Sequence, residues 1–161
     1  SIVCPVLQGT RCLLVEIQAL TVTGFLGSAK RKVSGLDSNR LAMLIAVLEK
    51  RGELRLADQD IFASSVGGRK VAEPAADLAV ALAIAGVHYN RQLCFDGGVC
   101  AFGEIGLGGE IRHVQQMRLR VGEAARLGFT HIVCPPSSVK PPPGCEMIVV
   151  RQLDEALQLL Q

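Results

Sequence analysis

The sequence predicts a single α+β domain that spans residues 1–161. Strand-like and helix-like segments alternate irregularly along the chain, and no internal repeat is present. Hydrophobic residues make up 49% of the chain, with five Phe, one Tyr and no Trp, so we expect an aliphatic core. One segment, residues 75–87, is apolar almost all round, as a helix in the centre of a core would be. A chain of this length fits one compact domain.

The strands are predicted from short β-rich segments that end at glycine, proline or polar turns. Residues 24–32 are expected to form a polar loop, residues 103–112 a glycine-rich hairpin, and residues 135–144 a proline-rich surface loop. The predicted strands are residues 12–21, 60–66, 99–104, 131–134 and 147–150.

The first helix is expected to begin at Asp37 or Ser38, since either side chain can cap it. Its apolar residues recur at helical spacing, and Lys50, Arg51 and Gly52 suit its carboxyl end. The apolar residues of this stripe are Leu41, Leu44, Ile45 and Leu48.

The central helix is expected after Pro74, a residue favoured in the first helical turn, and Asp77 is its one acidic residue. Residues 115–127 predict an amphipathic helix, and residues 153–160 a last one. In the amphipathic helix we expect an apolar side facing inward, with Met117, Val121, Ala124, Ala125 and Leu127. The charged residues Arg118, Arg120, Glu123 and Arg126 are expected to point outward.

The charge of the chain is modest. The net charge is +2 and the pI is near 8.3, below the value of about 9 that is typical of nucleic-acid-binding domains. A basic surface must therefore come from clustering of cations. The longest apolar run, residues 78–87, is too short to cross a bilayer, so no membrane partner is expected.

The six cysteines do not have the spacing of a metal site. None forms a C-x-x-C pair, and no histidine lies at ligand spacing beside two of them, so no metal is expected. Several lie among apolar neighbours, where a free thiol behaves as a small hydrophobic group. We expect reduced thiols and an intracellular or organellar compartment. Because the chain starts with Ser rather than Met, we expect it to be a piece of a longer protein.

Three segments carry a family resemblance, at residues 7–21, 34–85 and 102–129. In order, spacing and many consecutive residues, the chain resembles the C-terminal, Lon-protease-type domain of the RadA/Sms family over nearly its whole length. The segment GEIGLGGEIR within the third of these resembles the stretch of Lon proteases that carries their catalytic lysine. The resemblance implies a Lon-type proteolytic-domain fold with a mixed sheet and a buried apolar central helix.

The resemblance also implies a longer parent protein. Such proteins carry a zinc finger and a RecA-like ATPase, form hexameric rings, and work in DNA repair, recombination and branch migration as DNA-dependent ATPases or helicases. This chain contains no G-x-x-x-x-G-K-[ST] motif and no four-cysteine finger, so ATP, Mg and Zn are assigned to the parent. Recombinase or helicase partners would also belong to the parent. A bacterial cytoplasm with nucleoid association is the expected location, with a plastid or mitochondrion as the alternative.

The peptidase site of Lon enzymes is a Ser–Lys dyad, in which the lysine takes the proton of the serine hydroxyl. Matching the Lon P-S-A-G motif to residues 74–77 places Ala75 at the nucleophile position. The lysine position falls at Arg118, and an arginine stays protonated and cannot act as a base. We therefore expect no catalytic residues here.

Three substitute nucleophiles are possible from sequence proximity. Ser64 or Ser65 could act with Lys70, although turn chemistry is the simpler interpretation. The pair Cys100 and His113 is a weaker possibility. Ser137 or Ser138 could act with Lys140 in the proline-rich loop, where loop chemistry is again simpler.

The candidate DNA-binding residues are Lys30, Arg31 and Lys32 in the predicted loop, with Arg40 near the start of the next helix. Adjacent cations are either solvated or face anions, and backbone phosphates are the anions that give sequence-independent affinity. The resemblance favours this second interpretation, because RadA/Sms domains are thought to help hold DNA around the ring.

A second basic group, Arg112, Arg118, Arg120 and Arg126, is a candidate for DNA or subunit contacts. The aromatics are few and expected to be buried, so no stacking platform for bases is predicted. We expect contact with duplex phosphates, little sequence preference and a steep salt dependence.

Three functions follow from these observations. The first is a non-catalytic scaffold and DNA-binding domain that self-associates, as a hexameric ring, in a RadA/Sms-type repair protein. The second is an active Lon-type serine peptidase with an unconventional nucleophile. The third is a purely oligomerising domain that does not contact DNA.

Overall fold

The fold is known from a computed structural model that describes residues 1–25 and 27–161. Leu26, in the predicted loop at residues 24–32, lies outside the described residues. The strands are β1 (Ile2–Gln8), β2 (Arg11–Thr23), β3 (Arg31–Ser34), β4 (Gln59–Ser65), β5 (Gly98–Ala101), β6 (Glu104–Ile105), β7 (Ile111–Arg112), β8 (Phe129–Cys134) and β9 (Glu146–Val149). The α-helices are α1 (Ser38–Lys50), α2 (Asp77–Tyr89), α3 (Met117–Arg126) and α4 (Leu153–Leu157).

The described residues form a seven-stranded mixed sheet in the order β3-β4-β2-β1-β5-β8-β9. The pairs β1–β2 and β2–β4 are antiparallel, and the other neighbours in this sheet are parallel. Strands β6 and β7 form the predicted glycine-rich hairpin. The α+β class is therefore confirmed, and the arrangement is compatible with the expected Lon-type fold.

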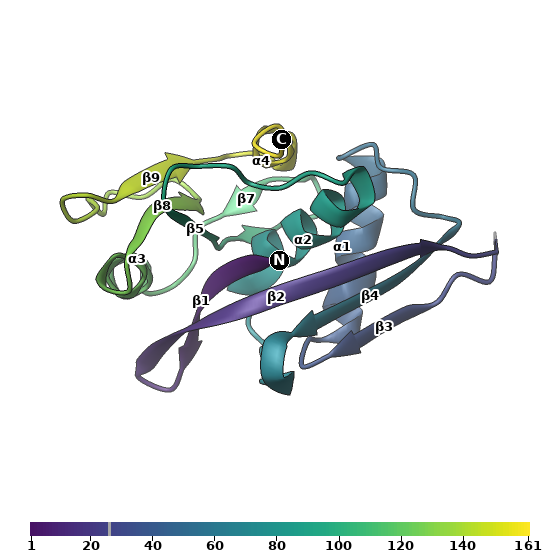
Figure 1. The fold of residues 1–161 in the computed structure, drawn as a ribbon, viewed down its shortest axis with the longest axis horizontal. Helices are drawn as coiled ribbons and strands as arrows, with labels where there is room; N and C mark the ends of the chain where they lie inside the picture. The colour runs from purple at the N-terminus through teal and green to yellow at the C-terminus, as the bar shows by residue number, and fades with distance from the viewer. Residues whose placement is uncertain (26) are drawn as a thin grey trace.

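Helix α2 is the centre of the core, as its sequence predicts. It is buried from Asp77 to Gly86, and a 3-10 turn at Pro74–Ala76 leads into it. It packs on β2 and β1, with α1 beside it (Figure 1). Helix α1 begins where its sequence predicts, because the Asp37 side chain accepts the N–H groups of Asn39 (2.7 Å) and Arg40 (3.2 Å).

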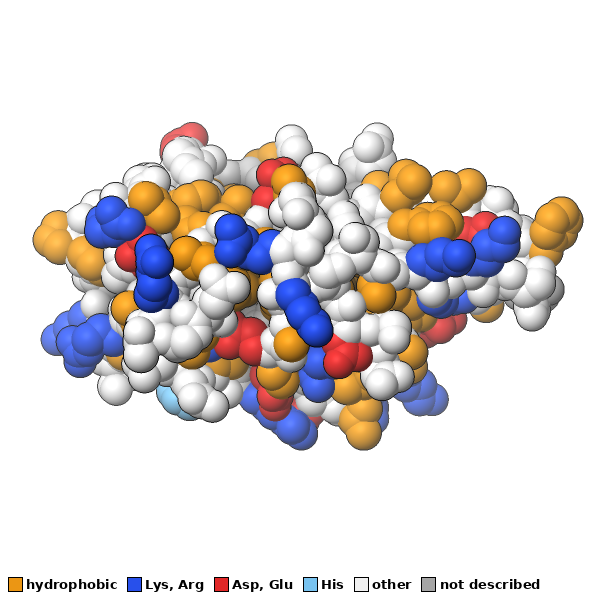
Figure 2. Space-filling view, turned by 90° about the horizontal axis from the view of Figure 1, so that it is seen from below, with side chains coloured by type: hydrophobic (Ala, Val, Ile, Leu, Met, Phe, Trp, Pro, Cys, Tyr) orange, Lys and Arg blue, Asp and Glu red, His pale blue; other side chains and the backbone are white. Residues whose placement is uncertain are grey.

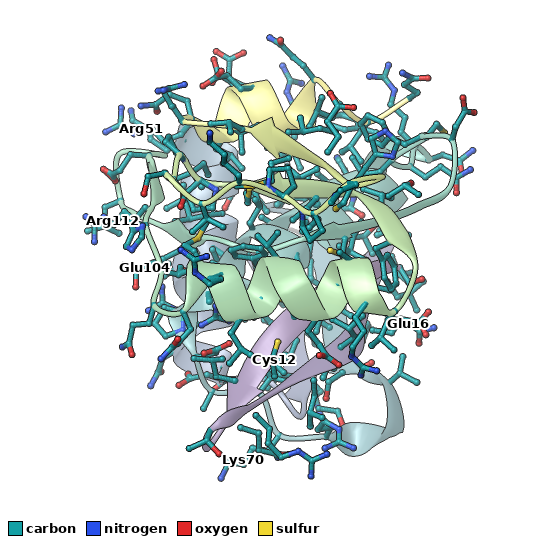
Figure 3. The ribbon with its side chains drawn as sticks, turned by 90° about the vertical axis from the view of Figure 1, so that its left-hand side faces the viewer. Cys12, Glu16, Arg51, Lys70, Glu104 and Arg112 are labelled. Atoms are coloured by element: carbon teal, nitrogen blue, oxygen red, sulfur yellow. The ribbon has the colours of Figure 1, made fainter. Side chains whose placement is uncertain are left out.

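Helix α3 covers one half of the sheet and leaves the other half open on that face. Helix α3 packs against β1, β2 and β8, and in Figure 3 it lies across β1 and β2 with α1 and α2 behind them, and with Cys12 beside it. It covers only the first part of β2. The second part of β2, together with β4 and β3, has α1 and α2 on one face. Its opposite face is open, with Gln18, Leu20 and Val22 exposed along β2.

Two parts of the sequence prediction for α3 are wrong. Arg120, expected outward, is only 1% exposed, and Leu127, expected inward, is 49% exposed. The helix begins at Met117, so its buried stripe runs through Met117, Arg120, Val121 and Ala124, at i, i+3, i+4 and i+7 spacing. Arg120 falls inside that stripe by its position, and Leu127 follows the last helical turn.

We expect Leu82→Ala to lower the free energy of unfolding by about 2–5 kcal/mol, because Leu82 is fully buried in α2 and its truncation leaves a cavity. Urea denaturation followed by circular dichroism measures the change. Val87→Ala, at an exposed position of the same helix, is the control and should change the value by less than about 0.5 kcal/mol. Equal losses for the two variants would contradict the central position of α2.

Candidate functional site

The position that corresponds to a Lon nucleophile lies in a pocket of about 260 Å³. Ala75 lines this pocket at the turn before α2, so a methyl group stands where a hydroxyl would be needed. The other lining residues are Leu7, Glu73, Pro74, Glu104, His113, Val114, Gln115 and Arg120. Among the residues that line it, the charged pair is formed by Glu73 and Arg120, on opposite sides of Ala75 in sequence and fold.

Four hydrogen bonds hold the guanidinium of Arg120 in place. Nη1 and Nη2 donate to the two carboxylate oxygens of Glu73 at 2.6 and 3.1 Å, a bidentate pair. Nη1 also donates to the Pro5 carbonyl at 3.0 Å, and Nε donates to the Gln115 carbonyl at 2.8 Å. The guanidinium lies over the Phe102 ring, 5.8 Å from its centroid. A cation so fully bonded is part of the structure, and it is not a base.

The pair also occupies an edge of β1. In the described residues β1 pairs with β5 only at Val3, so the edge beyond Val3 has no strand beside it. Arg120 binds the Pro5 carbonyl there, and the Leu7 N–H donates to Glu73 Oε1 at 2.9 Å. These side chains satisfy the backbone groups to which an extended peptide could otherwise bind.

The residue that faces Ala75 differs from the one that the sequence match suggests. Arg118, matched to the catalytic lysine, is exposed on α3 and does not line the pocket. Arg120, two residues later, points inward on the buried stripe of α3. The arginine that lines the pocket with Ala75 is therefore Arg120 and not Arg118. Either arginine stays protonated and cannot act as a base.

A second buried ion pair joins α1 to α2. Arg40 binds both carboxylate oxygens of Asp77, with 2.8 Å from Nε to Oδ1, and the Ile105 N–H donates to Asp77 Oδ2 at 3.1 Å. Burial raises the pKa of the Asp77 carboxyl, while Arg40 and the Ile105 N–H act in the opposite direction. Arg40 thus has a carboxylate partner within the fold, and its expected place with Lys30–Lys32 on a DNA-binding surface stays a prediction.

Two of the serines that were considered as substitute nucleophiles, Ser65 and Ser137, make local hydrogen bonds. Ser65 is buried, and its hydroxyl donates to the Arg69 carbonyl in the turn after β4. Ser137 accepts the Val139 N–H at 3.1 Å inside the proline-rich loop. These hydrogen bonds are the turn and loop chemistry that the sequence favours. Ser64 lies on the open face of the sheet, paired in register with Ser34 and Gln18.

Cys100 lacks the surroundings of a nucleophile. It is fully buried in β5, and burial raises the pKa of its thiol well above the ordinary value. A reactive cysteine needs a lowered pKa and access to solvent. His113 is exposed and lines the pocket beside Ala75, whereas Cys100 does not line that pocket. The geometry does not bring the two together there.

The basic segment at residues 30–32 is partly a strand, where the sequence predicts a loop. Arg31 begins β3, and its Nη2 donates to the Leu56 carbonyl at 2.8 Å, so Arg31 faces the interior side of the sheet. Lys30 and Lys32 are exposed, and in the described part of the chain neither takes part in a salt bridge. The Lys30 N–H donates to Asp60 Oδ1 at 2.7 Å, which fixes the start of the segment.

The second basic group does not form one surface. Arg112 lies 3.5 Å from Glu104 and 3.8 Å from Glu110, and Figure 3 shows it beside Glu104 at one side of the molecule. Arg126 pairs with Glu123 on the exposed side of α3. With Arg120 buried and Arg118 exposed by itself, the four arginines are spread over separate environments.

No metal or membrane site emerges from the described residues. In this part of the chain, no group of three or more His, Cys, Asp or Glu side chains is arranged to hold a metal ion. Among the same residues, no helix combines the length and the apolar character needed to cross a membrane.

Two functional features were not predicted from the sequence. Glu73 pairs with a residue 47 positions away, and no local pattern indicates such a contact. Phe62 is partly exposed on the open face, whereas we expected the aromatics to be buried. In the structure, more exposed and more buried residues alternate in β4 and the second part of β2, as in a sheet with one open face. The sequence does not show this alternation, because the apolar residues Leu20, Val22 and Phe62 lie on the open face.

The relatives found by comparison with known proteins share one name. The chain is 45% identical over 161 residues to "DNA repair protein RadA" of Escherichia coli (strain K12), an alignment that covers 99% of this chain and 35% of the relative. It is 40% identical over 166 residues to the protein of the same name from Chlamydia trachomatis, an alignment that covers 100% of this chain and 36% of the relative. It is 44% identical over 155 residues to the protein of the same name from Streptococcus pneumoniae, an alignment that covers 94% of this chain and 36% of the relative. No family model matches the chain.

The matched region comprises nearly all of this chain but only about a third of each of these relatives. The resemblance that the sequence suggested is confirmed at the level of the family. The chain therefore belongs to the RadA/Sms family, and it matches, over 94–100% of its residues, about one third of the length of proteins named DNA repair protein RadA.

Proposed function

We propose that this chain is a non-catalytic, Lon-like scaffold and DNA-binding domain of a RadA/Sms-type DNA repair protein. The relatives named DNA repair protein RadA support the repair role. The observation that carries the DNA-binding part is the position of Lys30 and Lys32, two exposed lysines free of salt bridges in the described residues, two positions apart at the edge of an open sheet face.

The absence of peptidase chemistry rests on the pocket around Ala75. A Ser–Lys mechanism needs a hydroxyl and a neutral amine in contact. The pocket offers a methyl group from Ala75 and the guanidinium of Arg120, which is bonded to Glu73. The same pair bonds the backbone groups at the free edge of β1, to which an extended peptide could otherwise bind.

The DNA-binding role rests on unpaired charge. Lys and Arg side chains that neutralise phosphates release counterions, and this supplies affinity without sequence preference. Lys30 and Lys32 are available for this, while Arg31 and Arg40 are already bonded within the fold. The number of such contacts is small, so we expect weak binding by this chain alone and tighter binding when several copies present their lysines together.

The parent protein would supply the remaining functions. We propose that it is an ATP-dependent recombination and branch-migration protein, a DNA-dependent ATPase or helicase. Its ATPase would bind ATP and Mg, its finger would bind Zn, and it would form a hexameric ring and work with recombinases or helicases. The bacterial relatives favour the cytoplasm, with nucleoid association, over an organelle. A purely oligomerising domain would assemble in the same way but would have no affinity for DNA.

The lysine pair provides the test of DNA binding. We expect the variant with Lys30→Gln and Lys32→Gln to bind a fluorescent duplex more weakly, and the slope of log affinity against log salt to fall by about 2, because about one counterion is released for each phosphate contact. Fluorescence anisotropy over a salt series measures both quantities. Lys140→Gln, an exposed lysine in the proline-rich loop, is the control. An unchanged salt slope in the double variant would remove the proposed role of this pair.

The pocket provides the test of peptidase function. We expect Ala75→Ser to yield neither casein hydrolysis nor labelling by a fluorophosphonate probe, because Arg120 remains charged and bonded to Glu73. Gel fluorescence of the labelled protein and a casein assay are the measurements. Covalent labelling of the introduced serine, or hydrolysis by the unaltered chain, would show that the site still supports acyl transfer.

A further inference from the structure

We propose that the open face of β2, β4 and β3 binds single-stranded DNA, with its bases against Leu20 and Phe62 and its phosphates at Lys30 and Lys32. This rests on the proposed DNA-binding function and adds the ligand form and the residues that contact the bases. The face is a groove of about 470 Å³. Its lining residues are Ser1, Gln18, Ala19, Leu20, Lys32, Val33, Ser34, Phe62, Ala63 and Ser64.

The register of the strands places apolar and basic side chains in one row. Leu20 of β2 pairs with Phe62 of β4, and Phe62 in turn pairs with Lys32 of β3. Side chains two residues apart in a strand point to the same face of a sheet, so Val22 lies next to this row. Lys30 precedes β3, and its backbone N–H donates to Asp60, the residue that pairs with Val22. Apolar surface is therefore bordered by two ammonium groups along the edge strand.

The apolar part of this face is exposed to a degree that core packing does not explain. Leu20 is 52% exposed, Val22 is 47% exposed, and Phe25 in the loop after β2 is 81% exposed. Figure 2 shows hydrophobic side chains next to Lys and Arg side chains at the right-hand end of the molecule, the end that β2, β4 and β3 occupy in Figure 1. Large apolar side chains gathered at one place on a surface are typical of a binding site.

The polar groups of the groove are free to bind a ligand. Gln18, Ser34 and Ser64 form the next row, and among the described residues their side chains have no hydrogen-bond partner within the protein. Amide and hydroxyl groups can donate to and accept from base edges. The acidic side chain beside Lys30 is Asp60, whose Oδ1 accepts the Lys30 N–H, so its charge is partly satisfied by the backbone.

These features together favour unpaired bases. In a duplex the base faces are stacked on one another and inaccessible to Leu20 and Phe62, whereas a single strand exposes them. Open sheets with an aromatic side chain and basic edges bind single strands by stacking, which contributes without sequence preference. A phosphate-only surface would need cations but would not need the exposed apolar row. The earlier expectation of duplex contact alone was based on aromatics being buried, and Phe62 is partly exposed.

The test compares an oligothymidine of about 12 nucleotides with a duplex of the same length, both fluorescein-labelled, by anisotropy at fixed salt. We expect Phe62→Thr to weaken binding of the single strand at least fivefold, roughly the effect of losing one stacked base, with duplex binding unchanged. Leu20→Thr should act in the same direction. Leu107→Thr, at an exposed leucine of the β6–β7 hairpin, is the matched control and should change neither.

A second measurement needs no variant. An oligonucleotide of the same length with abasic sites should bind the unaltered chain at least fivefold more weakly than oligothymidine. Because this comparison uses the unaltered chain, it tests the base contact even if Phe62→Thr fails to fold. Equal binding of the abasic strand, or equal loss for single strand and duplex in the Phe62 variant, overturns the base contact while leaving phosphate binding intact. Failure of the Lys30 and Lys32 variant to weaken either DNA would instead overturn the proposed function. Concentration-dependent dimers that Leu20→Thr abolishes, with oligonucleotide binding unchanged, would assign the face to a second copy.

Discussion

The bidentate contact between Glu73 and Arg120 is the interaction on which the rest of the site depends. It joins three parts of the chain that are far apart in sequence: the edge of β1, the turn before α2, and the buried side of α3. An ion pair that is removed from water is stable only when its remaining hydrogen-bonding groups are satisfied, and here carbonyl groups complete the set around Arg120. The wall of the pocket beside Ala75 consequently includes a fixed pair of opposite charges, Glu73 and Arg120.

The two halves of the sheet have different surroundings. In the half around β1, β5 and β8, helices lie on both faces of the sheet, and Arg120 is bonded to Glu73. In the half around β2, β4 and β3, one face has α1 and α2, and the other keeps exposed lysines and apolar side chains. The pocket beside Ala75 and the open face of β2, β4 and β3 lie on different parts of one sheet, so the proposed scaffold and DNA-binding roles are compatible.

Most of the fold could be predicted from the sequence. The apolar run of α2 and the Asp37 cap of α1 are local signals, and the structure confirms both. The strand character of residues 31–34 was missed, because β3 is a short, charged strand at the edge of the sheet and its sequence resembles a loop.

The site was less predictable. Ala75 could be identified by matching a motif, but Arg120, the arginine that lines its pocket, could not. Which side chains of α3 point inward depends on where the helix begins. A left-handed backbone conformation at Gln116 makes it begin at Met117. Charge alone suggested that Arg120 points outward. A buried arginine requires a distant carboxylate, and contacts at such separation leave no local signal. Arg40 also binds a carboxylate that is distant in sequence. Its position near Lys30, Arg31 and Lys32 suggested a shared surface, whereas in the structure it binds Asp77.

The measurement that tests this account most directly is a double-mutant cycle on the free energy of unfolding, with Glu73→Gln, Arg120→Met and both changes together. The account predicts a coupling energy of at least about 1 kcal/mol, because each single change leaves one charged or polar partner buried without its counterpart. Additive effects, within about 0.5 kcal/mol, would show that Glu73 and Arg120 do not act as a unit, and would contradict the structural role given to this pair.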